Sequence, residues 1–237
     1  MKWEFFSELF HDSWHSKIRP WIESEQCDKI YEFLKFESRR GKVIVPLSSN
    51  VWRCFKETSF DELKLVLCGF SPYHTLKDNK PIADGLLMSC SITNYPQPSL
   101  FQWYQACEQE LYNGINLNYT KNPDLKFLAK QGVLLLNSGL TCEALKPGSH
   151  NLKWEPFMKY LFEEVLSGTG VPIVLLGKEA HKLEKYIPPF TWLFKISHPV
   201  SASYSGSDWS SEGMFKSIDK ILWDTNKFKI QWLDTKN

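Results

Sequence analysis

The sequence lacks a marked excess of either charge. Its 237 residues carry 28 Lys and Arg against 27 Asp and Glu, which gives a formal net charge of +1. A protein that holds duplex DNA mainly through its phosphates usually shows a basic excess or a clear basic stripe. The charge balance therefore excludes a strongly electrostatic nucleic-acid binder and allows only a weak grip on a phosphate backbone.

Paired cysteines and long apolar runs are also missing. The six Cys residues form no C-x-x-C pair, and the His and Cys positions give no zinc spacing, so no metal is implied. Buried, reduced thiols are the expectation, which favours an intracellular protein. The first residues, Met-Lys-Trp-Glu-Phe-Phe, include an acid and no long apolar stretch. We therefore expect no signal peptide, no transmembrane segment and no membrane partner.

No repeat, low-complexity tract or linker divides the chain, which predicts one domain over residues 1–237. Apolar residues make up 43% of the chain, as in ordinary globular proteins. Unbroken apolar runs that alternate with amphipathic stretches indicate an α/β fold, with a central four-stranded parallel sheet and helices on both faces. The four predicted strands are Leu63–Cys68, Val133–Asn137, Pro172–Leu176 and Trp192–Ser197.

Residues of chemical use follow three of these four strands. Gly69–His74 comes after the first strand, Asn137 ends the second, and His198-Pro199 follows the fourth. Open α/β sheets bind their ligands at the carboxyl ends of the strands. The sequence therefore predicts one shared pocket at this edge of the sheet.

The segment Gly69-Phe70-Ser71-Pro72-Tyr73-His74 resembles the water-activating motif of family 1 uracil-DNA glycosylases, Gly-Gln-Asp-Pro-Tyr-His, at four of six positions. Further landmarks of that family follow in order along nearly the whole chain, which makes shared fold and ancestry the expectation. They are Trp14, Gly85–Ser89 (Gly-Leu-Cys-Phe-Ser in the family), Pro96–Leu100, Lys130–Asn137 with Leu140-Thr141, Ser149-His150, Trp154-Glu155 and His198-Pro199.

The resemblance implies a pocket that receives a base flipped out of the DNA stack. Asn137 would read the edge of uracil, Tyr73 would exclude the methyl group of thymine, and His198 would donate a hydrogen bond to the departing base. Structural alternatives stay open: a turn cap for Asn137, a packed aromatic for Tyr73, and a loop histidine for His198. His74 and Ser99 would contact phosphate, and Ser201 and Ala202 would lie in the loop that enters the minor groove.

Three departures concern the pocket itself. Ser71 stands where the family has its catalytic aspartate, and serine carries neither the charge nor the basicity of a carboxylate. Asp84 is among the nearest acids and is an alternative source of a carboxylate. Met88 replaces the phenylalanine that stacks on uracil, while Phe70, in place of glutamine, is a candidate for a new aromatic wall.

Other departures concern the DNA-binding loop. The leucine that fills the vacated stack is missing, and Ala202 is nearest to its position. Asp208 and Glu212 follow, with no cation before Lys216, so phosphates would be repelled.

Two functions follow as hypotheses. The first is a DNA N-glycosylase that is weak on uracil or has altered base specificity, acts on single- or double-stranded DNA, and needs no cofactor. The alternative is a catalytically inactive homologue that binds DNA or a protein, such as a replication or processivity component. A DNA-mimicking inhibitor is a further partner class. A protein that shares only the fold is the remaining reading.

Overall fold

A four-stranded parallel sheet forms the centre of the computed structural model, which describes residues 2–114 and 119–235. The strands β2 (Leu65–Gly69), β5 (Val133–Asn137), β7 (Ile173–Leu176) and β8 (Leu193–Ile196) lie in the order β5-β2-β7-β8. Every residue of β2, β5 and β7 is buried, as expected for parallel strands covered on both sides. The predicted fold class is confirmed, and each strand lies within two residues of its predicted bounds.

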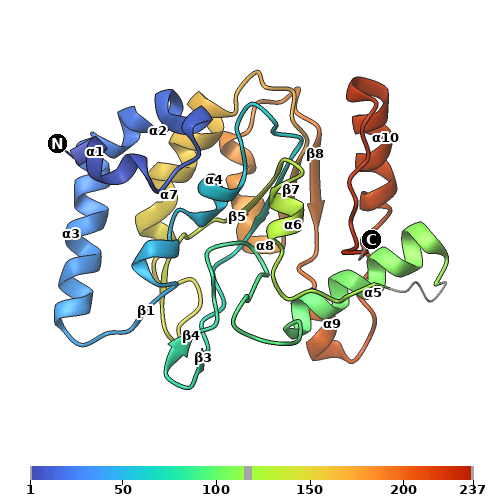
Figure 1. Cartoon of the computed structure of the whole chain (residues 1–237), viewed down its shortest axis with the longest axis horizontal. Helices are drawn as coiled ribbons and strands as arrows, with labels where there is room; N and C mark the ends of the chain where they lie inside the picture. Colours follow the sequence, from blue (N-terminus) through green and yellow to red (C-terminus); the bar gives the residue numbers. More distant parts are fainter. Residues whose placement is uncertain (1, 115–118, 236–237) are drawn as a thin grey trace.

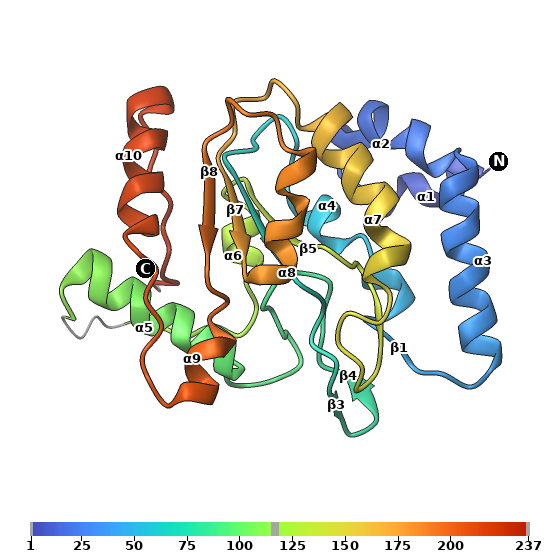
Figure 2. The same ribbon diagram turned by 180° about the vertical axis from the view of Figure 1, so that it is seen from behind.

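Helices cover both faces of this sheet. The short helices α4 (Arg53–Glu57) and α6 (Lys126–Ala129) contact β5, and α8 (Lys178–His181) contacts β7 and β2. Figure 1 shows α6 in front of the sheet, and Figure 2, from behind, shows α8 in front. Helix α7 (Asn151–Tyr160) continues into a π-helical turn, Leu161–Val165. Helix α10 (Met214–Asn226) stands beside the edge strand β8 in both views.

The amino-terminal helices pack an aromatic layer against the remainder of the core. They are α1 (Lys2–Ser7), α2 (His15–Ile22) and α3 (Glu25–Arg39), with a 3₁₀ turn at Asp12–Trp14. Trp14 is fully buried, and its indole N–H donates to Thr58 O at 2.7 Å. Trp52 and Phe157 meet edge to face at 5.1 Å between ring centroids. Such pairs bury much apolar area, so many of the aromatics fill the core.

Several small elements complete the fold. Strands β1 (Ile44–Val45) and β6 (Cys142–Glu143) pair antiparallel, as do β3 (Leu76–Lys77) and β4 (Lys80–Pro81). Short 3₁₀ turns lie at Ser48–Asn50 and Lys182–Tyr186. The six cysteines are buried, and none of them forms a disulfide bond. None of the helices in the described ranges has both the length and the apolar composition that a bilayer crossing requires.

Two helices position the side chains at the carboxyl ends of the strands. Helix α5 (Pro98–Tyr112) starts with Pro98, whose fixed φ suits the first turn. Helix α9 (Val200–Ser205) follows β8 directly and packs against α5. The sequence resemblance gives this segment as a loop, whereas the structure shows a short helix that ends at Gly206 in the left-handed conformation.

Candidate active site

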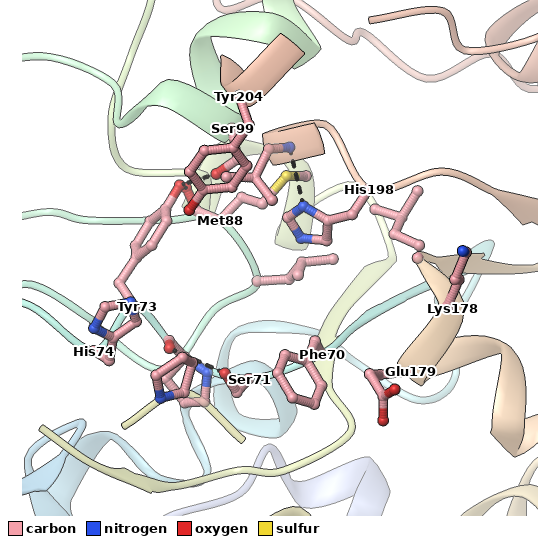
Figure 3. A pocket seen from close by; sticks show the side chains of 16 residues that line it. Phe70, Ser71, Tyr73, His74, Met88, Ser99, Lys178, Glu179, His198 and Tyr204 are labelled. Carbon is pink, nitrogen blue, oxygen red and sulfur yellow. Dashed lines mark hydrogen bonds between the residues drawn. The ribbon is translucent and has the colours of Figure 1, made fainter. Parts of the chain in front are cut away.

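A cavity of about 330 Å³ lies at the carboxyl ends of β2, β7 and β8 (Figure 3). Its wall comes from five parts of the chain that lie far apart in the sequence. They are Phe70–His74 after β2, Leu87 and Met88 before α5 together with Ser99 within it, Leu176 at the end of β7 with Gly177–Glu179 after it, His198, Val200 and Tyr204 after β8, and Pro147 on a further loop. The ends of β2 and β8 therefore meet at one cavity as expected, with that of β7 beside them, whereas the end of β5 is not part of its lining.

The loop after β2 is held rigidly at Phe70. Its carbonyl oxygen accepts hydrogen bonds from Ser138 Oγ at 2.7 Å and from Asn151 Nδ2 at 2.8 Å. The Phe70 ring packs on Gly148, where a methyl group would lie 2.1 Å from a ring carbon and where φ is +73°. Only glycine fits both restraints, so the aromatic ring forms a fixed wall. Ser71 follows on this wall, and its Oγ makes a long contact of 3.5 Å to Pro72 O.

Tyr73 spans the cavity from the same loop. Its hydroxyl lies 2.7 Å from Ser99 Oγ and donates to Met88 O at 3.2 Å. Burial raises the pKa of the Tyr73 phenol above its ordinary value, so this group is neutral at physiological pH. The two contacts fix the ring between the Met88 loop and the first turn of α5. A ring fixed in this way limits the shape of the ligands that the cavity can bind.

The Met88 loop depends on a buried ion pair. Asp84 accepts from Ser89 Oγ at 2.7 Å and from Ser91 N at 2.8 Å, and Arg53 Nη1 lies 2.7 Å from its carboxylate. Asp84 is 2% exposed and is not among the residues that line the cavity. The alternative that Asp84 supplies the missing catalytic carboxylate is therefore wrong, because its oxygens are committed to this loop. The pair instead supports Met88, whose φ of +56° is unusual for a residue other than glycine.

His198 faces the cavity in its neutral form. Burial lowers the pKa of the imidazole to about 4. Its Nδ1 lies 3.1 Å from the backbone N–H of Val200 and accepts that hydrogen bond, which places the single ring proton on Nε2. Gly177 lies under the histidine, where φ is +87° and a methyl group would lie 2.9 Å from His198 Cβ. The site therefore presents a neutral N–H donor with a defined position.

Asn137 does not line the cavity. It ends β5 opposite Gly69 of β2 and is 4% exposed. A methyl group at Gly69 would lie 2.4 Å from Leu87 Cδ1 and 3.7 Å from Asn137 Oδ1, so both side chains face the same glycine. Among the described residues, no hydrogen-bond partner lies within reach of this buried Oδ1. Leu87 does line the cavity, and the family motif has the smaller cysteine at its position.

The residues expected to contact DNA are placed in different ways. His74 and Ser99 line the cavity, and the buried Nδ1 of His74 has no partner among the described residues. Ser201 is exposed, and its hydroxyl donates to His198 O at 2.7 Å, so it closes the first turn of α9. Ala202 is only 5% exposed, and its helix α9 packs against α5. A buried alanine cannot enter the space that an extruded base leaves.

Several cavity residues were not among the predicted site residues. Tyr204 is 85% exposed and lines the same cavity as Ser99 and Met88 (Figure 3). Glu179 is the only acid among the described residues that line the cavity, and it pairs with Lys182 at 2.6 Å. In Figure 3 the Phe70 ring lies between Ser71 and Glu179. Glu179 could have been identified from the sequence only by its position just after the predicted third strand.

Comparison with known proteins places the chain in a family. None of the known family models matches it. It is 33% identical over 224 residues to the uracil-DNA glycosylase of Pseudomonas aeruginosa, with 93% of each chain covered. It is 29% identical over 228 residues to that of Coxiella burnetii, covering 94% of this chain and 96% of the relative.

Solved structures agree in fold. The mimivirus uracil-DNA glycosylase superimposes with a TM-score of 0.82 at 20% identity, covering 98% of this chain and 89% of the mimivirus chain. A related crystal structure holds the mimivirus enzyme with its Y322L change in complex with UGI. The sequence relatives and the shared fold together show that this chain belongs to the uracil-DNA glycosylase family.

Proposed function

We propose that this protein is a DNA N-glycosylase that holds an extruded base in the cavity and hydrolyses its glycosidic bond slowly, or with a base preference other than uracil. The observation that carries the proposal is the pairing of a fixed Tyr73 with a neutral His198 donor in one cavity, next to Ser71. Family membership supports the class of reaction, since the relatives bear the name uracil-DNA glycosylase.

The chemistry would proceed through the His198 donor. When the bond between the base nitrogen and the sugar carbon breaks, its electron pair stays on the base, which becomes an anion. The Nε2 proton of His198 is available to donate a hydrogen bond to this anion, and a preformed donor in a partly buried site needs no reorganisation. Water then adds to the sugar carbon and releases a proton to solvent.

Ser71 would hold that water. Its hydroxyl can donate and accept hydrogen bonds but has neither the charge nor the basicity of a carboxylate. Loss of a positioned base typically costs about 10²–10⁴ in rate. The proposed turnover is slow for this reason, and the altered walls at Phe70, Leu87 and Met88 support a changed base preference.

DNA would be bound weakly and without a minor-groove plug. The net charge of +1 and the buried Ala202 support this expectation. Under this proposal both single-stranded and double-stranded DNA are substrates. The protein would act on DNA inside a cell. A protein inhibitor is a further proposed partner, because the mimivirus relative has been crystallised with UGI.

A base-release assay tests the proposal. Single- and double-stranded oligonucleotides bearing uracil or one of a panel of modified bases are incubated overnight with micromolar protein, and free base is measured by mass spectrometry. We expect release from at least one oligonucleotide, and loss of that release in His198→Ala. If the wild-type protein releases no base from any of them, the glycosylase proposal is wrong.

A binding role without catalysis is the second candidate. Replacement of the catalytic carboxylate by Ser71 together with burial of Ala202 favours it, because both changes reduce excision and neither closes the cavity. The protein would then bind DNA or a protein partner and act as a replication or processivity factor. Binding of uracil-containing DNA with no release of any base would favour this candidate over the first.

A further inference from the structure

A second hollow of about 550 Å³ adjoins the cavity on the far side of α9. Val200 and Tyr204, four residues apart on one face of α9, line the first cavity. Ala202, on the opposite face, lines the second hollow together with Gly206, which follows the helix. One short helix therefore separates the two.

The second hollow is lined in part by aromatic and proline side chains. Its apolar wall consists of Tyr95, Pro96, Pro98 and Phe101, from the loop before α5 and the first turns of that helix. Tyr95 is 60% exposed and Phe101 is 42% exposed, so both rings remain accessible. Exposed aromatics beside a nucleic-acid path provide stacking surfaces that tolerate any base, because every base has a π-face.

Polar groups around the hollow match the edge of a base better than a phosphate. Gln102 accepts from the Trp209 backbone N–H at 2.9 Å through Oε1, which orients its NH₂ group as a fixed donor. Asp208 lines the hollow and repels phosphate, but it accepts hydrogen bonds from the amino groups of bases. Lys121 Nζ lies over the Phe101 ring, 4.8 Å from its centroid, and pairs with Glu108 at 3.5 Å, so the positive charge beside the aromatic wall is balanced in part by this carboxylate.

We propose that this hollow is a second base subsite, which takes the nucleotide next to the extruded one. The inference rests on the proposed function, since it assumes a base in the first cavity. In a duplex the neighbouring base is stacked and paired, and removing it costs a few kcal/mol more. The buried Ala202 offers nothing to fill the gap in a duplex, whereas a single strand has no gap to fill.

A binding experiment with abasic neighbours tests the subsite. The probes are dye-labelled single strands of about 11 nucleotides with one central 2′-fluoro-deoxyuridine, which resists cleavage. One probe has both neighbouring bases, one lacks the 5′ neighbour, one lacks the 3′ neighbour, and a fourth has thymine at the centre. Dissociation constants are measured by fluorescence anisotropy for the wild type and for Tyr95→Ala, Phe101→Ala and Phe190→Ala. Phe190 is 99% exposed and precedes β8 at the opposite end of the sheet, so it serves as the matched control.

We expect loss of one neighbour, on one side only, to weaken wild-type binding by about 5- to 100-fold. In Tyr95→Ala and Phe101→Ala this penalty should shrink to less than about 2-fold, while Phe190→Ala should retain it in full. Both rings are already exposed, so their removal takes little from the core.

Three results would overturn the subsite. The wild type could bind the intact strand and both abasic strands with equal affinity, or it could bind none of the strands. Alternatively, the loss of affinity for the abasic strand could remain unchanged in both Tyr95→Ala and Phe101→Ala. The proposed function is tested separately by the base-release assay, and the thymine probe reports only on discrimination between the two bases. If no base is released from any oligonucleotide while the neighbour penalty is present, the subsite stands and the glycosylase proposal fails.

Discussion

The buried neutral imidazole of His198 makes stability depend on pH in a specific window. Its pKa is about 4 in the folded protein, against an ordinary value of 6.5. At pH values between these two pKa values, the histidine of the unfolded chain binds a proton and that of the folded chain does not. The free energy of unfolding therefore falls as pH decreases through this window, and the loss is complete below the folded pKa.

The magnitude follows from the size of the pKa shift. The full loss from this group is about 3 kcal/mol at most, because the ring keeps some contact with solvent. Most of it, about 2 kcal/mol, falls between pH 7.5 and pH 5. The His150 pKa is also lowered by burial, but its contribution is common to the wild type and to a His198 variant.

Urea unfolding at pH 7.5 and pH 5 measures this effect. We compare the wild type with His198→Asn, in which an amide oxygen can accept the Val200 N–H but nothing titrates. The wild type should lose about 2 kcal/mol more than the variant over this interval, with equal m-values. An equal pH dependence in the two proteins would refute the neutral, buried histidine on which the proposed chemistry depends.

The remaining predictions concern the cavity wall and its support. Leu87→Ala should expose Asn137 and tighten the binding of uracil-containing single strands, at a cost of about 2–5 kcal/mol in stability. Unchanged affinity in an anisotropy titration would contradict the inference that Leu87 covers Asn137. Arg53→Met should cost about 3–5 kcal/mol in urea unfolding, because Asp84 is left buried without its cation, and a loss under about 1 kcal/mol would contradict this role. Glu179→Gln should change base release less than about 3-fold, since Phe70 lies between Glu179 and Ser71, whereas a drop of about 100-fold would show that its carboxylate acts in catalysis.

The strands could be predicted because their signal is local. Leu65–Gly69 and Val133–Asn137 are unbroken apolar runs, and such runs between helical stretches are typical of buried parallel strands. The convergence of Tyr73 and His198 on one cavity follows from the same rule, since parallel strands end at one edge of the sheet.

The positions of Asn137 and Ala202 could not be predicted in the same way. Asn137 is buried beside Leu87, which comes from a loop 50 residues earlier and faces the same glycine. Ala202 turns inward because residues 200–205 form a helix packed on α5, whereas the sequence resemblance indicates a loop. Both outcomes depend on contacts between distant segments, which no local pattern reports. The second hollow, between α5 and α9, could not be predicted from the sequence for the same reason.

Restoring the carboxylate tests most directly whether the cavity holds an extruded base. Release of uracil and of the panel of modified bases from single-stranded oligonucleotides is measured for the wild type, Ser71→Asp and the uncharged control Ser71→Asn. A cavity that holds an extruded base in position predicts a gain of about 10²–10⁴ in rate on at least one of these bases for Ser71→Asp alone. If a folded Ser71→Asp protein releases none of these bases faster than the wild type and the control, the cavity does not hold a base for cleavage, and the central claim is contradicted.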